Sequence, residues 1–204
     1  MPVSAEARWF WRGSPGEFEQ WFRSGDVAAG GGGARDDEYL VDPRQQELGI
    51  KKRAGKAGIE IKGLVDVGVP LPAPFPGRLQ IWSKWTSYAT TIDHLPRIVV
   101  RKTRWVRKYD TGGDHVREIA LDSAERPRDA AMPWPEFGCQ MELTEVATGD
   151  DRWWTFGFEA FGSLQTVESS LLRTVAHLRA IPAGSLAAAR ELSYPAWLAI
   201  TAQA

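Results

Sequence analysis

The chain has 204 residues, of which 43% are hydrophobic and 25% charged, and its formal net charge is −1 at pH 7. This composition is typical of a globular protein with a sizeable core, and the balanced charge does not steer the whole molecule to nucleic acid or membrane. The single cysteine, Cys139, excludes an intramolecular disulfide and a thiolate metal cluster. There is neither a run of about 18 apolar residues nor a secretory signal, so we expect one cytoplasmic domain over residues 1–204.

Alternating polar and apolar residues predict a series of strands joined mostly by hairpin-like turns. The predicted strands are 6–12, 38–42, 48–53, 59–67, 78–85, 97–109, 115–122, 139–146 and 152–161. A four-glycine run, Gly30–Gly33, is interpreted as a flexible loop, because it lacks the GK[ST] ending of a phosphate-binding P-loop.

Helices are predicted near both ends of the chain. Ser14, Pro15 and Glu17 have the order of a capping box that opens a helix over 15–23. Ser163 is the predicted cap of a helix over 164–178, where leucines and valines recur at helical spacing. A last helix is expected over about 185–192, ended or kinked by Pro195.

The order of these elements predicts an α+β, mainly β fold. Many strands, no βαβ repeat and helices at the ends indicate an antiparallel eight-stranded closed barrel, or tunnel, with covering helices that include the C-terminal ones at about 163–204.

Several strands carry one apolar and one charged face, as in 59–67, where Glu60 and Lys62 lie opposite Ile59, Ile61, Val65 and Val67. Periodicity alone cannot tell a solvated outer face from a charged lumen. We favour the charged lumen, because an amphipathic helix needs an apolar barrel surface to cover. The residues expected under the helices are Ile59, Ile61, Leu79, Ile81, Met141, Leu143, Phe156 and Phe158. Those expected in the lumen are Glu6, Arg8, Lys51, Arg53, Glu60, Lys62, Arg78, Lys84, Lys102, Arg104, Glu142 and Glu159.

Five blocks then carry a resemblance to a known family. They are Tyr39-x-x-Asp42 followed by the basic strand LGIKKR, then IEIKG from Ile59, RKTRWV from Arg101, IALD ending at Asp122, and FGCQMEL from Phe137. In this order they resemble the CYTH superfamily, the triphosphate tunnel metalloenzymes, over roughly residues 6–161.

The resemblance implies a barrel in which lysines and arginines bind triphosphate and glutamates hold a divalent metal. The implied phosphate-binding residues are Arg8, Lys51, Arg53, Lys62, Lys102 and Arg104, and the implied ligands of Mg²⁺ or Mn²⁺ are Glu6, Glu142 and Glu159. Basic groups neutralise a polyanion, and hard oxygen ligands suit these metals.

The sequence departs from the family at the metal. Where the family has E-x-E-x-K near the N-terminus, this chain has Glu6-Ala7-Arg8, and the late E-x-E reads Gln140-Met141-Glu142. Two of four expected carboxylates are missing, and a positive charge at Arg8 disfavours a cation.

Two functions therefore stay open. In the first, the chain binds a triphosphate, a nucleotide or a polyphosphate and hydrolyses it with a divalent metal. In the second, it is a catalytically degraded barrel that only binds an anion or a hydrophobic-anionic ligand, without turnover. A third alternative, from another class, is a β-domain that serves as an interaction module.

The remaining reactive residues favour ordinary structural roles. His94, His115 and His177 lie on different elements without metal-ligand spacing, so we expect surface histidines. Cys139 is expected to pack on an apolar strand face. The basic strand at 97–108 divides its charge over two faces, which makes nucleic acid an improbable partner.

Overall fold

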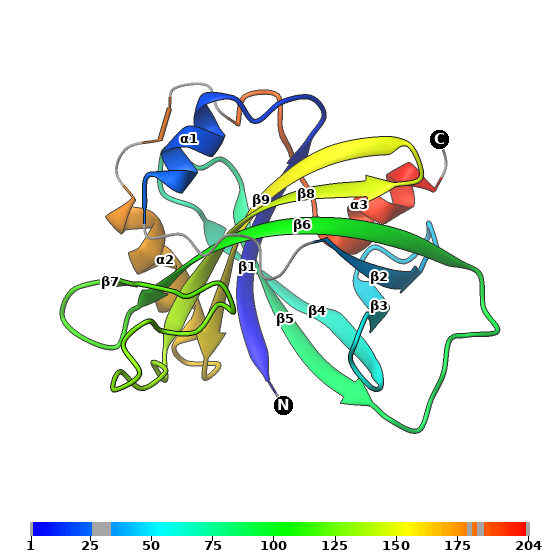
Figure 1. Ribbon diagram of the computed structural model, residues 1–204, viewed down its shortest axis with the longest axis horizontal. Coiled ribbons are helices and arrows are strands. Elements are labelled where there is room, and N and C mark those ends of the chain that lie inside the picture. Colours follow the sequence, from blue (N-terminus) through cyan, green and yellow to red (C-terminus); the bar gives the residue numbers. More distant parts are fainter. Residues whose placement is uncertain (1, 26–33, 179–180, 183–185, 203–204) are drawn as a thin grey trace.

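The computed structural model describes residues 2–25, 34–178, 181–182 and 186–202. Within them, eight strands form a closed antiparallel barrel in the order β1-β5-β4-β3-β2-β6-β8-β9, and β9 pairs back with β1 (Figure 1). The predicted fold is thus confirmed. The barrel strands are β1 (Val3–Trp11), β2 (Arg35–Leu40), β3 (Leu48–Arg53), β4 (Ile59–Pro70), β5 (Arg78–Ser87), β6 (Arg97–Asp110), β8 (Gly138–Thr148) and β9 (Asp151–Gly162).

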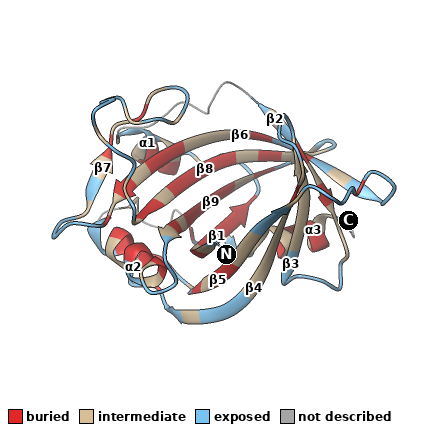
Figure 2. Cartoon of the chain, turned by 90° about the horizontal axis from the view of Figure 1, so that it is seen from below, coloured by how far each residue is buried: buried red, intermediate tan, exposed pale blue. Residues whose placement is uncertain are grey.

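Two short strands and three helices complete the described part of the chain. Strand β7 (Arg117–Ile119) pairs with β6, and β10 (Arg190–Glu191) pairs with β1. The helices are α1 (Glu17–Arg23), α2 (Val167–His177) and α3 (Tyr194–Thr201). Figures 1 and 2 show α1 and α2 at one end of the barrel and α3 at the other. No helix among the described residues is long and apolar enough to cross a membrane.

The largest apolar cluster lies between the barrel and the first two helices. Phe156 and Phe158 of β9 are fully buried in one cluster with Phe18 of α1 and Leu171 of α2. Burying each such side chain stabilises the fold by about 1.5–3 kcal/mol. Figure 2 shows β8 and β9 buried along most of their length, because one face packs under the helices and the other faces the barrel interior. Of the residues expected on this apolar face, six belong to the cluster under the helices: Leu79, Ile81, Met141, Leu143, Phe156 and Phe158. Ile59 and Ile61 do not belong to it, and Ile61 is only half-buried.

Helix α3 packs on a second apolar cluster at the opposite end. The indole of Trp197 stacks on Phe10 of β1 with ring centroids 5.0 Å apart. The backbone N–H of Leu192 also donates to the carbonyl of Arg8 at 3.0 Å. These contacts hold the first residues of α3 against the barrel interior.

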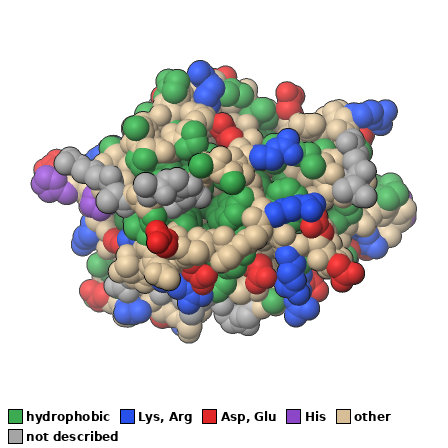
Figure 3. Space-filling model, turned by 90° about the horizontal axis from the view of Figure 1, so that it is seen from above, with side chains coloured by type: hydrophobic (Ala, Val, Ile, Leu, Met, Phe, Trp, Pro, Cys, Tyr) green, Lys and Arg blue, Asp and Glu red, His purple; other side chains and the backbone are tan. Residues whose placement is uncertain are grey.

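The outer surface carries charges of both signs. On the face drawn in Figure 3, hydrophobic side chains gather in the central, recessed part, with Lys, Arg, Asp and Glu side chains around them. The barrel interior carries an excess of basic side chains, as described below.

The predicted capping residues of α1 and α2 were wrong. The N-cap of α1 is Gly16 at φ 52°, and the hydroxyl of Ser14 accepts a hydrogen bond from the Gly16 N–H instead of capping the helix. Helix α2 begins at Val167, because Ser163 and Thr166 bond to each other in the turn before it. Leu164 is consequently 60% exposed and outside the helix.

The C-terminal predictions also need correction. The expected helix over about 185–192 is replaced, in its described residues, by a turn at 186–188 and by strand β10. Pro195 lies in the first turn of α3, where its missing N–H has no consequence, rather than at a helix end. Gly30–Gly33 lies outside the described residues.

Two strand predictions fail in part. The expected strand over 115–122 shortens to β7, because Asp122 begins a tight turn by accepting hydrogen bonds from the N–H groups of Ala124 and Arg126. On β4, Val65 and Val67 are 61% and 46% exposed. A bulge between Leu64 and Asp66 interrupts the alternation, and β3 pairs no further than Gly63.

Candidate functional site

A cavity of about 150 Å³ lies inside the barrel, lined by side chains from all eight barrel strands and by Ser193, Tyr194 and Pro195 at the start of α3. This volume is well above the roughly 10–15 Å³ that a cavity needs to hold one water, so there is room for several waters and hence for a small anion. All nine residues implied as phosphate or metal ligands line it: Glu6, Arg8, Lys51, Arg53, Lys62, Lys102, Arg104, Glu142 and Glu159. Of the residues expected in the lumen, Arg78 is the exception, since it is exposed at the start of β5.

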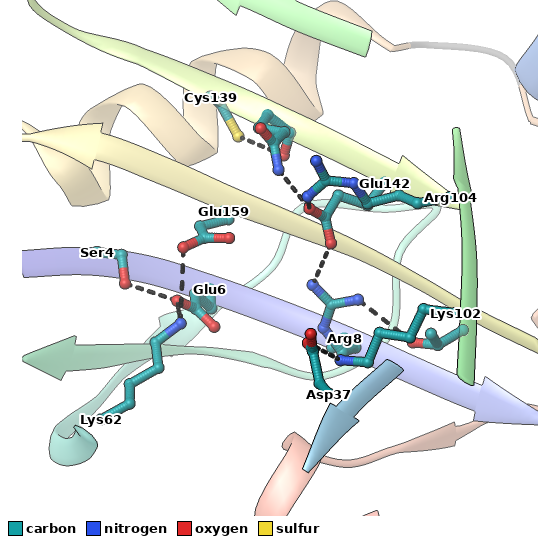
Figure 4. Close-up of polar contacts among 12 residues, drawn as sticks. Ser4, Glu6, Arg8, Asp37, Lys62, Lys102, Arg104, Cys139, Glu142 and Glu159 are labelled. Carbon is teal, nitrogen blue, oxygen red and sulfur yellow. Dashed lines mark hydrogen bonds and ion pairs between the residues drawn. The ribbon is translucent and has the colours of Figure 1, made fainter. Parts of the chain in front are cut away.

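The cavity lining contains eight basic and four acidic side chains. Arg35 of β2, which the sequence interpretation missed, is one of the bases, and Thr144 of β8 is a further polar lining residue that was missed. Most of these bases and acids fall into three groups, which differ in how completely the cations are paired, and Figure 4 shows part of each group. Outside the groups, Lys84 lies 3.6 Å from Glu60.

The first group, the Asp37 cluster, consists of Asp37, Arg35, Lys51 and Lys102. The carboxylate of Asp37 is fully buried and lies 3.4 Å from Arg35 Nε, 3.5 Å from Lys51 Nζ and 3.4 Å from Lys102 Nζ. Neither of its oxygens accepts a hydrogen bond from a described residue. Burial would raise the pKa of Asp37, but the surrounding cations lower it below its usual value. The Asp37 carboxylate thus attracts three cations without accepting a hydrogen bond from any of them. Lys51 also pairs with Glu60 at 3.2 Å.

Lys102 is the most enclosed cation of this cluster. Its ammonium lies 3.9 Å from the ring centroid of Tyr194 and 4.8 Å from that of Tyr39, and it donates to the Tyr39 hydroxyl at 2.6 Å. Burial lowers the pKa of Lys102 well below that of an ordinary lysine, the charge of Lys51 lowers it further, and Asp37 only partly opposes both. The fold therefore keeps the Lys102 amine in an environment that disfavours its charged form.

Arg53 lies beside this cluster, opposite Asp37 in the pairing of β3 with β2. It lines the cavity, and no ion pair joins it to any other described residue. Its guanidinium is thus a further cation available to a ligand.

The second group, the Glu142 cluster, consists of Glu142, Arg8, Arg104 and Glu125. Glu142 accepts hydrogen bonds from Arg8 at 3.0 Å and from Arg104 at 2.8 Å. Arg104 also donates to Glu125 at 2.6 Å. Burial would raise the pKa of Glu142, but Arg104 and Arg8 hold it far below the usual value. Here each guanidinium has a carboxylate partner with hydrogen-bond geometry.

The third group joins Lys62 of β4 to two carboxylates. Its ammonium donates to Glu6 and lies 3.6 Å from Glu159, which faces Glu6 across β1 and β9 (Figure 4). Burial opposes the charge on Lys62, but Glu159 and Glu6 raise its pKa. A single cation here keeps two facing acids from repelling each other.

The residues do not fit the divalent metal that the resemblance implies. Glu6, Glu142 and Glu159 line one cavity, but each is engaged by a basic side chain, and Arg8 is directly bonded to Glu142. In the described part of the chain, no three His, Cys, Asp or Glu side chains group in a way that could hold a metal ion.

The other reactive residues lie away from the cavity. His94, His115 and His177 are exposed, as expected. Cys139 is fully buried in the cluster under the helices, and burial raises the pKa of its thiol, which disfavours a nucleophilic thiolate.

Comparison of the chain with protein-family models finds no match, and comparison with curated proteins finds none either. The resemblance to the CYTH superfamily therefore stays a prediction from the sequence.

Proposed function

We propose that this protein binds a small phosphorylated anion, such as a triphosphate, a nucleotide or a polyphosphate, inside its barrel and without a divalent metal held by the cavity carboxylates. The observation that carries the proposal is the Asp37 cluster. Three cations surround the Asp37 carboxylate there without one hydrogen bond to it, although Lys51 also pairs with Glu60, and Arg53 adds a fourth cation beside them.

A phosphate group satisfies what this cluster lacks. Its oxygens accept short, charge-assisted hydrogen bonds from ammonium and guanidinium groups, and its negative charge offsets the repulsion among them. Because the cavity is enclosed, these interactions are screened less than at a surface. The Thr144 hydroxyl, which is buried in the cavity wall and has no partner among the described residues, is a further donor.

The ion pairs already made by the acidic side chains of the cavity favour binding without turnover over metal-dependent hydrolysis. Glu142 is already the shared partner of two arginines, and a metal there would have to displace Arg8. Removing a buried carboxylate from its arginines leaves uncompensated charge, which is strongly unfavourable.

The test is isothermal titration with tripolyphosphate, ATP and orthophosphate, first with EDTA and then with Mg²⁺ or Mn²⁺. We expect saturable binding of tripolyphosphate in EDTA and no release of phosphate with either metal. Absence of binding under all conditions would overturn the proposal, and metal-dependent turnover would overturn its metal-free part.

A matched pair of variants locates the site. Lys51→Met removes an inward-facing ammonium, whereas Lys52→Met removes its neighbour on β3, which is paired with Asp93. Loss of a hydrogen bond to a charged group should weaken tripolyphosphate binding about tenfold in the first variant. The second should bind like the wild-type protein, and equal effects of both would place the anion elsewhere.

A further inference from the structure

The loop after β7 carries a backbone conformation that is unusual for its residue. Glu125 has φ 62°, and it is the only non-glycine residue with a positive φ in the described part of the chain. Hydrogen bonds around Asp122 hold the turn: its carboxylate accepts from the N–H groups of Ala124 and Arg126, and its carbonyl accepts from the N–H of Glu125. Left-handed backbone is unfavourable for glutamate, so the loop holds this side chain in place against a local preference.

The held carboxylate is directed at a cavity base. Both oxygens of Glu125 accept hydrogen bonds from Nη2 of Arg104, one of them at 2.6 Å. The other arm of Arg104 donates to Glu142 at 2.8 Å. Glu125 is not itself a lining residue of the cavity, but its carboxylate makes with Arg104 the charge-assisted hydrogen bond that a phosphate oxygen would make.

Arg104 differs in this respect from its neighbour in the same cavity. Lys102 lies two positions earlier on β6 and faces the same cavity, about 6–7 Å away at the rise of a strand. A single phosphate bound at the Asp37 cluster therefore does not require a contact with Arg104. A chain of phosphates that extends along β6 meets Arg104 and the carboxylate already bonded to it.

We propose that Glu125 is a specificity-determining residue that competes with the ligand for Arg104. It limits the affinity for phosphate chains long enough to reach from the Asp37 cluster to Arg104, and it leaves the affinity for a single phosphate unchanged. This inference rests on the proposed function, because it concerns which anions the cavity prefers.

The test compares tripolyphosphate with orthophosphate by isothermal titration in metal-free buffer. Glu125→Gln keeps the shape of the side chain and removes its charge. Glu125→Gly removes the whole side chain and suits the positive φ, so at least one variant keeps the loop conformation. The control is Glu145→Gln, which removes a carboxylate paired with exposed Arg152 outside the cavity.

We expect both Glu125 variants to bind tripolyphosphate about tenfold more tightly than the wild-type protein, since a competing charged hydrogen bond is removed. Orthophosphate affinity and the control should not change. Unchanged or weaker tripolyphosphate binding would overturn the inference, and so would an equal gain for both ligands. Failure of the wild-type protein to bind either anion would instead overturn the proposed function.

Discussion

The Asp37 cluster and the Glu142 cluster are built from the same residue types in one cavity, yet their charges are satisfied to different degrees. In the Glu142 cluster, each arginine has a carboxylate partner at hydrogen-bond distance. In the Asp37 cluster, three cations lie 3.4–3.5 Å from one carboxylate that accepts no hydrogen bond from the described residues. The first arrangement satisfies its charges within the protein, whereas the second is the basis of the anion binding that we propose.

The largest expected effect comes from breaking the Glu142 cluster. Glu142→Gln leaves the buried guanidinium of Arg8 without its carboxylate partner, and removing one partner of a buried pair costs about 3–5 kcal/mol. The free energy of unfolding from urea titration measures this change. Glu145→Gln, at an exposed pair, should change it by less than about 1 kcal/mol. If Glu142→Gln has the same free energy of unfolding as Glu145→Gln, the ion pairs of the Glu142 cluster do not stabilise the fold as we expect.

The Asp37 cluster should respond in the opposite sense. Lys102→Met removes an ammonium that burial and Lys51 destabilise, so we expect no loss of stability at neutral pH. Tripolyphosphate affinity should fall at least tenfold, because a hydrogen bond to a charged group contributes about 1.5–3 kcal/mol. Urea titration and calorimetry on the same sample measure both quantities. If Lys102→Met loses stability and keeps its affinity for tripolyphosphate, the Asp37 cluster stabilises the fold and does not bind the anion.

The dependence of stability on pH separates the clusters further. The pKa of Lys102 is lower in the folded state than the ordinary 10.5, so between these two values the unfolded state binds more protons. Stability therefore rises as pH increases through this window, with a slope of up to about 1.4 kcal/mol per pH unit. The difference between wild type and Lys102→Met, measured by urea titration across that window, isolates this slope. Parallel curves would contradict the lowered pKa.

Glu142 makes stability rise with pH in a second, acidic range. Its folded-state pKa lies below the ordinary 4.5, so its contribution to stability is complete above that value and is lost as pH falls below it. The wild-type protein should lose stability on acidification more steeply than Glu142→Gln, by the same urea measurement.

The smallest expected effect concerns Arg53. Because no ion pair joins it to another described residue, Arg53→Gln should leave stability within about 0.5 kcal/mol. Affinity for tripolyphosphate should fall about fivefold, as expected for a partly screened ionic contact of about 1 kcal/mol. Calorimetry on the variant and the wild-type protein measures the change in affinity. A loss of stability much larger than about 0.5 kcal/mol would mean that Arg53 has a structural partner.

Much of the fold and most of the cavity could be predicted because strands alternate with a period of two. Once Glu60 and Lys62 are assigned to one face and Ile59 to the other, the same alternation on the other strands places their charged residues together. The inverted barrel follows from the amphipathic helix that needs an apolar surface.

The residues that the sequence interpretation missed lie near the ends of strands, or are positioned by contacts between segments far apart in the sequence. Asp37 and Arg35 precede the predicted strand over 38–42, so their alternation was not assigned. Tyr194 lies on the cavity because Trp197 docks on Phe10, a contact between opposite ends of the chain that no local pattern indicates. Glu125 reaches Arg104 only through a left-handed turn.

The pairing of β1 with β9 joins Val3 to Gly162 and Trp11 to Trp154, so the barrel wall closes through residues that are far apart in the sequence. Closure over such separations is slow, and barrels of this kind fold in about milliseconds to seconds. Tyr194 follows β9 in the chain and belongs to the cavity wall, so the wall is complete only when the C-terminal segment lies against β1. An anion bound as we propose would therefore stabilise only a chain whose C-terminal segment has reached β1.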